Sequence, residues 1–103
     1  MKRKLEKIFA FYGWHHQLRK LKEEQKEVIR AIKWYEKVKR IEPNEEMLEV
    51  YRENVAEEIA DNFNVLAQFM LDVGVTADEI KAMMKYKQAR TISEMGRERE
   101  GRK

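Results

Sequence analysis

The stretch Asn54–Phe63 has the sequence Asn-Val-Ala-Glu-Glu-Ile-Ala-Asp-Asn-Phe, and it decides the fold class of this chain. Apolar residues recur every three or four positions through this stretch and on both sides of it, which is the spacing of one face of an α-helix. The residues at this spacing are Tyr51, Val55, Ile59, Phe63, Leu66 and Met70. The sequence therefore predicts a long helix with Ile59 at the centre of its apolar face.

Two acids of this helix, Glu58 and Asp61, are predicted to lie on a stripe beside that apolar face. At about 100° per residue, Glu58 lies roughly 100° from Ile59, and Asp61 lies about 60° further round in the same direction. The same stripe holds Met47, Tyr51, Val65 and Phe69. Glu57, about 160° from the centre of the face, is expected to face water. Because a partly buried carboxylate costs free energy unless a cation neutralises it, the Glu58/Asp61 pair indicates a cation site.

A second acidic pair lies upstream, in the stretch Lys22–Glu27. The apolar face of this helix is predicted to hold Trp14, Leu18, Leu21, Val28 and Ile32, with Gln25 as its one polar member. Glu24 is expected at the edge of that face with Glu27 on the same flanking stripe, whereas Glu23 points almost directly away from it. If the two helices run antiparallel, the two acidic pairs can meet in a cage of four carboxylates.

Length and composition predict a single all-α domain. A chain of 103 residues is long enough for one hydrophobic core but not for two. The 43% of hydrophobic residues and 40% of charged residues indicate a core with a heavily solvated surface, and one Pro and four Gly favour helices. We expect this domain to cover residues 1–95. Residues 96–103 form a charged tail without apolar side chains, which is expected to be disordered.

The composition also argues against several classes of protein. The chain has no cysteine, so it can form neither disulfides nor thiolate metal sites. The basic N-terminus is followed by an apolar stretch, Leu5–Tyr12, that is interrupted by charges and too short for a signal or a membrane span. The net charge of +3 is small and its basic residues are mixed with acids. We therefore expect a cytoplasmic protein with neither a membrane nor a nucleic-acid polymer as its partner.

Helix-breaking and capping residues divide the chain into four helices, which would form a four-helix bundle-like domain. Gly13 breaks the first helix from the second, and the turn Glu42-Pro43-Asn44 separates the second from the third. Gly74 is a natural residue to follow a helix end, and Thr76–Glu79 is a capping-box pattern that opens the fourth helix. The expected helices cover approximately residues 2–12, 14–40, 44–73 and 77–96.

The predicted cage contains only oxygen ligands. Four carboxylates without histidine or cysteine favour Mg²⁺ or Mn²⁺ over zinc. Di-iron bundles also use glutamates on facing helices, but they add a Glu-x-x-His motif that neither acidic stretch supplies. A single acidic stretch is most often a solvated helix face with pairs such as Lys20 to Glu24. Two acidic pairs on apolar helices together favour the metal site.

The two acidic motifs carry a resemblance to a known family. Glu23-Glu24-x-x-Glu27 followed by Glu58-x-x-Asp61 resembles the signature of the MazG-like, all-α nucleoside triphosphate pyrophosphohydrolases, and the likeness covers roughly residues 14–90. The resemblance implies a bundle that assembles as a homodimer or homotetramer. It also implies Mg²⁺-dependent cleavage of a nucleoside triphosphate between its α and β phosphates, with Mn²⁺ as a possible substitute.

The resemblance also implies roles for individual residues. The catalytic metal ligands would be Glu24, Glu27, Glu58 and Asp61, with Glu23 and Glu57 one layer outside them. Lys87 and Arg90 would bind the departing pyrophosphate, although a solvated basic face explains these two residues equally well. Apart from the resemblance, amphipathic rings suit stacking on a nucleobase, and the candidates are Trp14, His15, His16, Trp34, Tyr35 and Tyr51. Tyr51 is the best candidate for the wall of a nucleobase pocket, and burial in the core is the alternative for Trp14.

Two functions remain open on the sequence. The first is the pyrophosphohydrolase. The second is a non-catalytic helical module that dimerises through its aromatic faces, regulates another process and uses its acids for solubility. In both cases we expect an oligomer, because the predicted helices carry apolar residues on more than one face and a small monomer cannot cover them all.

Overall fold

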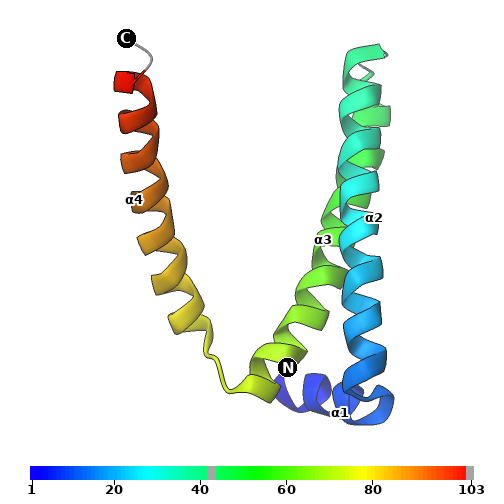
Figure 1. The fold of residues 1–103 in the computed structure, drawn as a ribbon. Helices are drawn as coiled ribbons and strands as arrows, with labels where there is room; N and C mark the ends of the chain where they lie inside the picture. Colours follow the sequence, from blue (N-terminus) through cyan, green and yellow to red (C-terminus); the bar gives the residue numbers. More distant parts are fainter. Residues whose placement is uncertain (42–43, 102–103) are drawn as a thin grey trace. The chain divides into compact units, whose positions relative to one another are not determined.

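The computed structural model describes residues 1–41 and 44–101, and the fold is all-α, as predicted (Figure 1). Its four helices are α1 (Lys2–Tyr12), α2 (Trp14–Ile41), α3 (Glu45–Val73) and α4 (Ala77–Gly101). The predicted turn at Glu42-Pro43-Asn44 falls largely on residues 42–43, which lie outside the described residues. None of the helices in the described ranges combines the length and the apolarity needed to cross a membrane.

The helix boundaries follow from the residues that the sequence singled out. Gly13 and Gly74 both have φ of 86°, a backbone conformation that favours glycine, and they directly follow α1 and α3. At the start of α4, the backbone N–H of Glu79 donates to Thr76 Oγ1 at 3.1 Å, and the N–H of Thr76 donates to Glu79 Oε2 at 3.4 Å. These two bonds form the predicted capping box. Asn44 Oδ1 accepts from the N–H of Glu46 at 2.9 Å and so caps α3.

The chain divides into two compact units, Met1–Leu71 and a second unit that begins at Asp72. The first contains α1, α2 and most of α3, and the second contains the end of α3 and all of α4. This division differs from the single domain predicted over residues 1–95. None of the described residues of α4 is buried.

In the first unit, α2 and α3 pack side by side and antiparallel (Figure 1). Gln17 Nε2 near the start of α2 donates to Gln68 Oε1 near the end of α3 at 2.8 Å. Buried and half-buried positions alternate three and four residues apart on both helices, which is the spacing of a left-handed coiled-coil contact. We call these positions the seam: Gln17, Leu21, Glu24, Val28, Ala31, Tyr35 and Val38 on α2, and Leu48, Tyr51, Val55, Glu58, Asn62, Val65 and Phe69 on α3.

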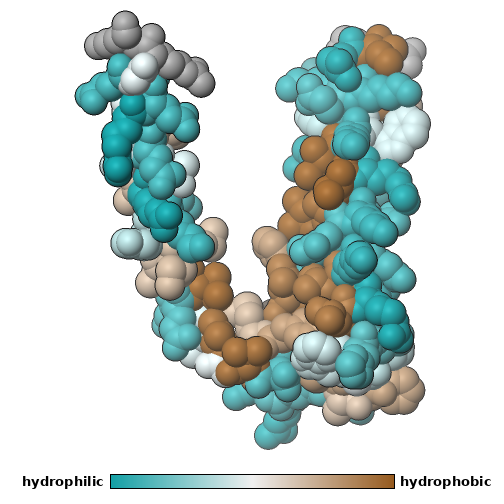
Figure 2. All heavy atoms as spheres, viewed as in Figure 1, coloured by the Kyte–Doolittle hydropathy of each residue, from teal (hydrophilic) through white to brown (hydrophobic). Residues whose placement is uncertain are grey.

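The seam corrects the predicted apolar faces. Phe63, predicted to lie on the buried face of α3, is 63% exposed, and Trp14, Leu18 and Ile32 of α2 are close to half exposed. The apolar face of each helix is wider than the strip that contacts the other helix. The contact follows a repeat of 3.5 residues, so it buries only one edge of each face and leaves the remaining apolar residues exposed. Apolar atoms outside the seam remain exposed along α3 (Figure 2).

Aromatic side chains join α1 to the end of the α2–α3 pair. The rings of Phe9 and Phe69 meet edge to face with centroids 5.3 Å apart, and Trp14 meets Phe69 in the same way at 6.2 Å. Leu5 of α1 is buried. Edge-to-face pairs of this kind are favourable, and they hold α1 where Tyr12 can reach the site described below.

The predicted charged tail differs from the structure at residues 96–101, which continue α4 to Gly101. Residues 102–103 lie outside the described residues. Arg and Glu are good helix formers, so a segment without apolar residues can still extend an existing helix. Side-chain bonds one turn apart support this part of α4: Arg90 Nε donates to Glu94 Oε1 at 3.2 Å, and Arg97 Nη2 donates to Ser93 Oγ at 3.3 Å.

The same substitution at two valines of α3 tests the position of the seam. Val65 is 4% exposed and Val50 is 62% exposed. Val65→Ala should lower the free energy of unfolding by about 1–3 kcal/mol, because it leaves a cavity in the seam. Val50→Ala should change it by no more than about 0.5 kcal/mol. Urea denaturation of both variants measures this, and an equal loss at both positions would contradict the assigned packing.

Candidate metal centre

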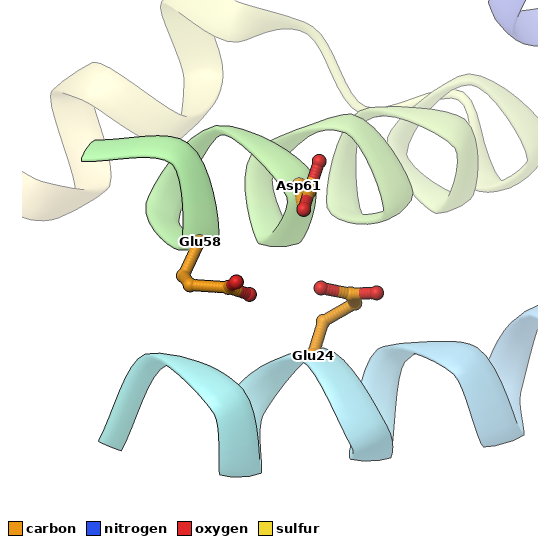
Figure 3. A group of neighbouring side chains, drawn as sticks. All are labelled: Glu24, Glu58 and Asp61. Atoms are coloured by element: carbon orange, nitrogen blue, oxygen red, sulfur yellow. The ribbon is translucent and has the colours of Figure 1, made fainter. Parts of the chain in front are cut away.

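Three carboxylates from two facing helices meet at the middle of the seam (Figure 3). Glu24 projects from α2, while Glu58 and Asp61 project from α3. One carboxylate oxygen from each residue lies within 4.8 Å of the other two. Glu24 and Glu58 occupy seam positions, so the antiparallel packing itself brings their side chains together. We call these three residues the acid cluster.

Burial in the acid cluster decreases from Glu24 to Asp61. Glu24 is only 7% exposed, Glu58 is half-buried and Asp61 is exposed. Loss of hydration raises the pKa of Glu58 above its ordinary value, and the negative charges of Asp61 and Glu24 raise it further. A cation bound at the cluster would relieve the repulsion between these carboxylates.

Among the residues that the structure describes, one cation pairs with the acid cluster. Lys20 lies one helical turn before Glu24, and its Nζ is 3.1 Å from Glu24 Oε1. The hydrogen bond to Glu24 and the charge of that carboxylate raise the pKa of Lys20, with smaller contributions from Glu23 and Asp61. Lys20 therefore stays charged beside the most buried carboxylate of the cluster.

The predicted cage of four acids is brought together only in part, because Glu27 lies outside the group that the described residues form. Glu27 is half-buried, and its Oε1 accepts a hydrogen bond from Arg30 Nη1 at 2.9 Å. Position 27 is three residues beyond Glu24 and beside the seam rather than in it, so its carboxylate pairs with a cation of its own helix. Its charge is still close enough to contribute to the raised pKa of Glu58.

The outer acids lie where the helical periodicity predicts. Glu23 and Glu57 are both exposed, and neither belongs to the acid cluster. Asn62, at the seam position after Glu58, is a further polar group near the centre of the seam. Its Oδ1 is buried with no hydrogen-bond partner among the described residues. An oxygen without a partner costs free energy in an apolar contact, so the seam is more polar here than packing alone requires.

A cavity of about 420 Å³ adjoins the acid cluster. Its walls include Glu24 and Asp61 together with Lys20, and the remaining lining residues are Ile8, Tyr12, His16, Gln17, Asn64, Val65 and Gln68. This volume lies in the range of pockets that bind small molecules and cofactors. The carboxylates therefore line one side of a space large enough for a ligand.

Hydrogen bonds and ring stacking connect several of the side chains that line this cavity. His16 Nδ1 donates to Gln17 Oε1 at 2.7 Å, and Gln17 Nε2 donates in turn to Gln68 Oε1. Gln17 and Gln68 are buried, and the hydrogen bond between their side chains satisfies Gln17 Nε2 and Gln68 Oε1. The ring of His16 stacks on that of Tyr12, with centroids 4.7 Å apart and planes inclined by 18°.

The predicted wall of the nucleobase pocket does not coincide with this cavity. Tyr51 is a half-buried seam residue, Trp14 packs against Phe69, and neither lines the cavity. Sequence reasoning missed Tyr12, Gln17 and Gln68, and it considered His16 only as one of several rings that could stack on a base. The signal that could have found Gln17 is its spacing of seven residues from Glu24 and fourteen from Ala31, the three buried positions of α2.

The predicted phosphate-binding residues lie in the second unit. Lys87 and Arg90 are exposed on α4, and Arg90 pairs with Glu94 at 3.2 Å. The carbonyl oxygen of Lys87 accepts from Thr91 Oγ1 at 2.9 Å. Their role toward the acid cluster stays a prediction.

No family model, curated protein or solved structure matches this chain. The case for a function therefore rests on the acid cluster and the cavity beside it.

The raised pKa of Glu58 predicts how stability depends on pH. A carboxyl whose pKa is higher in the folded state binds its proton more tightly there than in the unfolded chain. The resulting stabilisation is present below the ordinary value of 4.5 and is lost as the pH rises through the pKa of the folded state. Glu58→Gln should remove this loss, so its free energy of unfolding should fall less than that of the wild type between about pH 4 and pH 7.

Urea denaturation across that range, in a chelating buffer, measures the effect. Glu57→Gln is the matched control, because it neutralises the neighbouring acid outside the cluster and should keep most of the wild-type pH dependence. Identical pH profiles for Glu58→Gln and the wild type would contradict the assigned environment of Glu58.

Proposed function

We propose that this protein is a divalent-cation-dependent nucleoside triphosphate pyrophosphohydrolase. It would cleave a nucleoside or deoxynucleoside triphosphate between the α and β phosphates, giving the monophosphate and pyrophosphate. The observation that carries this proposal is the convergence of three carboxylate oxygens within 4.8 Å of one another beside a cavity of about 420 Å³. A site for a divalent cation next to space for a ligand is what the hydrolysis of a phosphoric anhydride requires.

The acid cluster fits Mg²⁺, with Mn²⁺ as a substitute. Carboxylate oxygens are the ligands that these hard cations prefer, and no softer donor belongs to the group. Burial and the neighbouring negative charges raise the pKa of Glu58, and a cation here would relieve both effects. A divalent cation would supply Lewis-acid activation of the phosphate oxygens. Glu24, Glu58 and Asp61 would bind the cation. Glu27 would become a fourth ligand if its ion pair with Arg30 broke.

The side chains around the acid cluster have distinct tasks in this proposal. One of the acids at the cation, assisted by Glu23 or Glu57, would take a proton from the attacking water. Glu23 and Glu57, outside the cluster, would orient water or ligands around it. The resemblance alone gives Lys87 and Arg90 the role of binding the departing pyrophosphate.

The nucleobase would occupy the part of the cavity formed by Tyr12, His16, Gln17 and Gln68. The stacked rings of Tyr12 and His16 offer an aromatic surface beside the cavity, and the amides of Gln17 and Gln68 would exchange their present hydrogen bond for bonds to the edge of the base. This set replaces Tyr51 and Trp14 as the proposed base-binding residues. Bases with different hydrogen-bonding edges should be distinguished by the amide pair, because an unmatched buried amide costs binding free energy.

The exposed apolar residues support a homo-oligomer, as a dimer or tetramer. In the first unit, Phe63 and Ile29 are both more than half exposed, and in α4 the same holds for Met83, Met84, Ile92 and Met95. Apolar exposure on this scale is typical of a surface that binds another protein. We expect the protein to act in the cytoplasm, with a nucleotide rather than a membrane or a nucleic-acid polymer as its ligand.

The same exposure favours the second candidate function, a non-catalytic helical module that dimerises and acts in regulation. In that case the acid cluster would bind no cation with useful affinity and the cavity would bind no nucleotide.

Substitution of inner and outer acids tests the proposed activity. Glu24→Gln and Asp61→Asn should lower the rate of pyrophosphate release by several orders of magnitude, because each removes a charged ligand at the reacting phosphates. Glu23→Gln and Glu57→Gln should cost much less, since these side chains lie outside the cluster. The assay is pyrophosphate release from a panel of ribo- and deoxynucleoside triphosphates with Mg²⁺.

Full activity of Asp61→Asn would contradict its assignment as a ligand. An equal loss for the inner and outer variants would show that more acids than the cluster contribute. No release from any nucleotide would favour the non-catalytic module.

Charge placed on the exposed apolar surface tests oligomerisation. Phe63→Asp should shift a dimer or tetramer toward smaller species in sedimentation at low micromolar concentration, because it places a carboxylate in an apolar contact. Asn54→Asp, which adds the same charge at an exposed polar position of α3, is the control and should leave the assembly unchanged. A wild-type protein that sediments as a folded monomer would contradict the proposed assembly.

A further inference from the structure

Lys20 contacts the acid cluster but has no role in the activity proposed above. Among residues 1–41 and 44–101 it is the one cation in an ion pair with the acid cluster, through the 3.1 Å contact of its Nζ with Glu24 Oε1. The side chain of Glu24 is 9% exposed, so this carboxylate relies on a partner that reaches it from within the fold. A buried charge without such a partner is strongly destabilising.

The partner itself is only partly enclosed. The side chain of Lys20 is 47% exposed, and its ammonium has a flexible stem of four carbons. Lys20 also lines the cavity that Glu24 and Asp61 line. A small rotation of the stem can therefore carry the ammonium from the carboxylates into the cavity without any movement of the helix.

A divalent cation at the acid cluster would meet Lys20 directly. The divalent cation and the Lys20 ammonium would compete for the carboxylate of Glu24, and at a separation of a few ångströms they would repel each other. A nucleoside triphosphate bound in the cavity would bring several negative charges to the opposite side of the same ammonium. When cation and nucleotide are both bound, the ammonium of Lys20 is therefore repelled on the side of the acid cluster and attracted on the side of the cavity.

We propose that Lys20 is a built-in counter-ion of the acid cluster, neutralising Glu24 until a divalent cation binds and then contacting the phosphates of the nucleotide. This inference rests on the proposed function and adds to it a residue that works in both states of the site. Lys20 lowers the affinity for the cation alone and raises the affinity for the nucleotide. It also keeps the buried carboxylate paired when the cation is absent.

The ordinary interpretation of Lys20 and Glu24 is an i, i+4 pair that adds slightly to helix stability. That interpretation predicts small effects of the same sign on everything that depends on the fold. If Lys20 is a counter-ion, its removal should raise the affinity for the divalent cation and lower the affinity for the nucleotide. These opposite effects distinguish the two interpretations.

The experiment compares Lys20→Met with Lys22→Met in the full chain. Both remove one positive charge from α2, and Lys22 is exposed and does not line the cavity. Mn²⁺ binding is measured by titration followed by electron paramagnetic resonance, without nucleotide. Binding of tripolyphosphate is then measured by calorimetry at saturating Mg²⁺. Lys20→Met should bind Mn²⁺ about tenfold more tightly than the wild type and tripolyphosphate about tenfold more weakly.

Lys22→Met should match the wild type in both titrations, and Lys20→Arg, which keeps the charge, should restore most of the tripolyphosphate affinity. Unchanged or weaker Mn²⁺ binding by Lys20→Met, with the wild type binding normally, would overturn the counter-ion. Tighter Mn²⁺ binding with unchanged tripolyphosphate affinity would overturn the phosphate contact. A wild-type protein that binds no Mn²⁺ would instead contradict the proposed function itself. If Lys20→Met is unfolded by circular dichroism, Lys20→Gln is measured against the same outcomes.

Discussion

The packing of α2 against α3 depends on a seam that places carboxylates where a helical hairpin normally places leucine. Glu24 and Glu58 both occupy seam positions, and Asp61 stands beside them, so antiparallel packing forces three acids together. Desolvation and mutual repulsion oppose this arrangement, as the raised pKa of Glu58 records. Such a contact is less stable than an apolar one, and the cation that we propose would offset this cost.

The rest of the first unit offsets this cost and shapes the space beside it. The hydrogen bond between the side chains of Gln17 and Gln68 satisfies Gln17 Nε2 and Gln68 Oε1 one coiled-coil repeat away from Glu24. The aromatic contact of Phe9 with Phe69 holds α1 at the same end, where Trp14 of α2 also meets Phe69. Tyr12 at the last turn of α1 completes the cavity with His16. The acid cluster, its counter-ion and the candidate base site thus depend on the register of a single pair of helices.

Local signals in the sequence predicted the helices well. Gly13, Gly74 and the capping box at Thr76 act through backbone conformation and hydrogen bonds within a few residues, so their effect does not depend on packing. The prediction that α4 ends near Gly96 was wrong, because an apolar face is not needed for charged helix formers to extend a helix. The all-α fold class follows from the same local signals.

Long-range features were less accessible to sequence reasoning. The apolar face of α3 is wide enough for several contacts, and only the partner helix decides that Val65 is buried while Phe63 is exposed. Glu58 and Asp61 were identified because an acid among apolar residues is visible in the sequence. The separation of Glu27 from the cluster could not be predicted, because it depends on whether its carboxylate meets Arg30 or the facing helix.

The central claim is that the acid cluster binds a divalent cation, and thermal unfolding tests it most directly. A cation that binds only the folded state raises the melting temperature by mass action. Wild-type protein should melt several degrees higher in millimolar Mg²⁺ or Mn²⁺ than in a chelating buffer. Asp61→Asn should melt at or above the wild-type temperature in the chelating buffer, because repulsion within the cluster falls, and should gain little from either cation. A wild-type melting temperature that does not respond to the cations, or an equal rise for Asp61→Asn, would contradict the account.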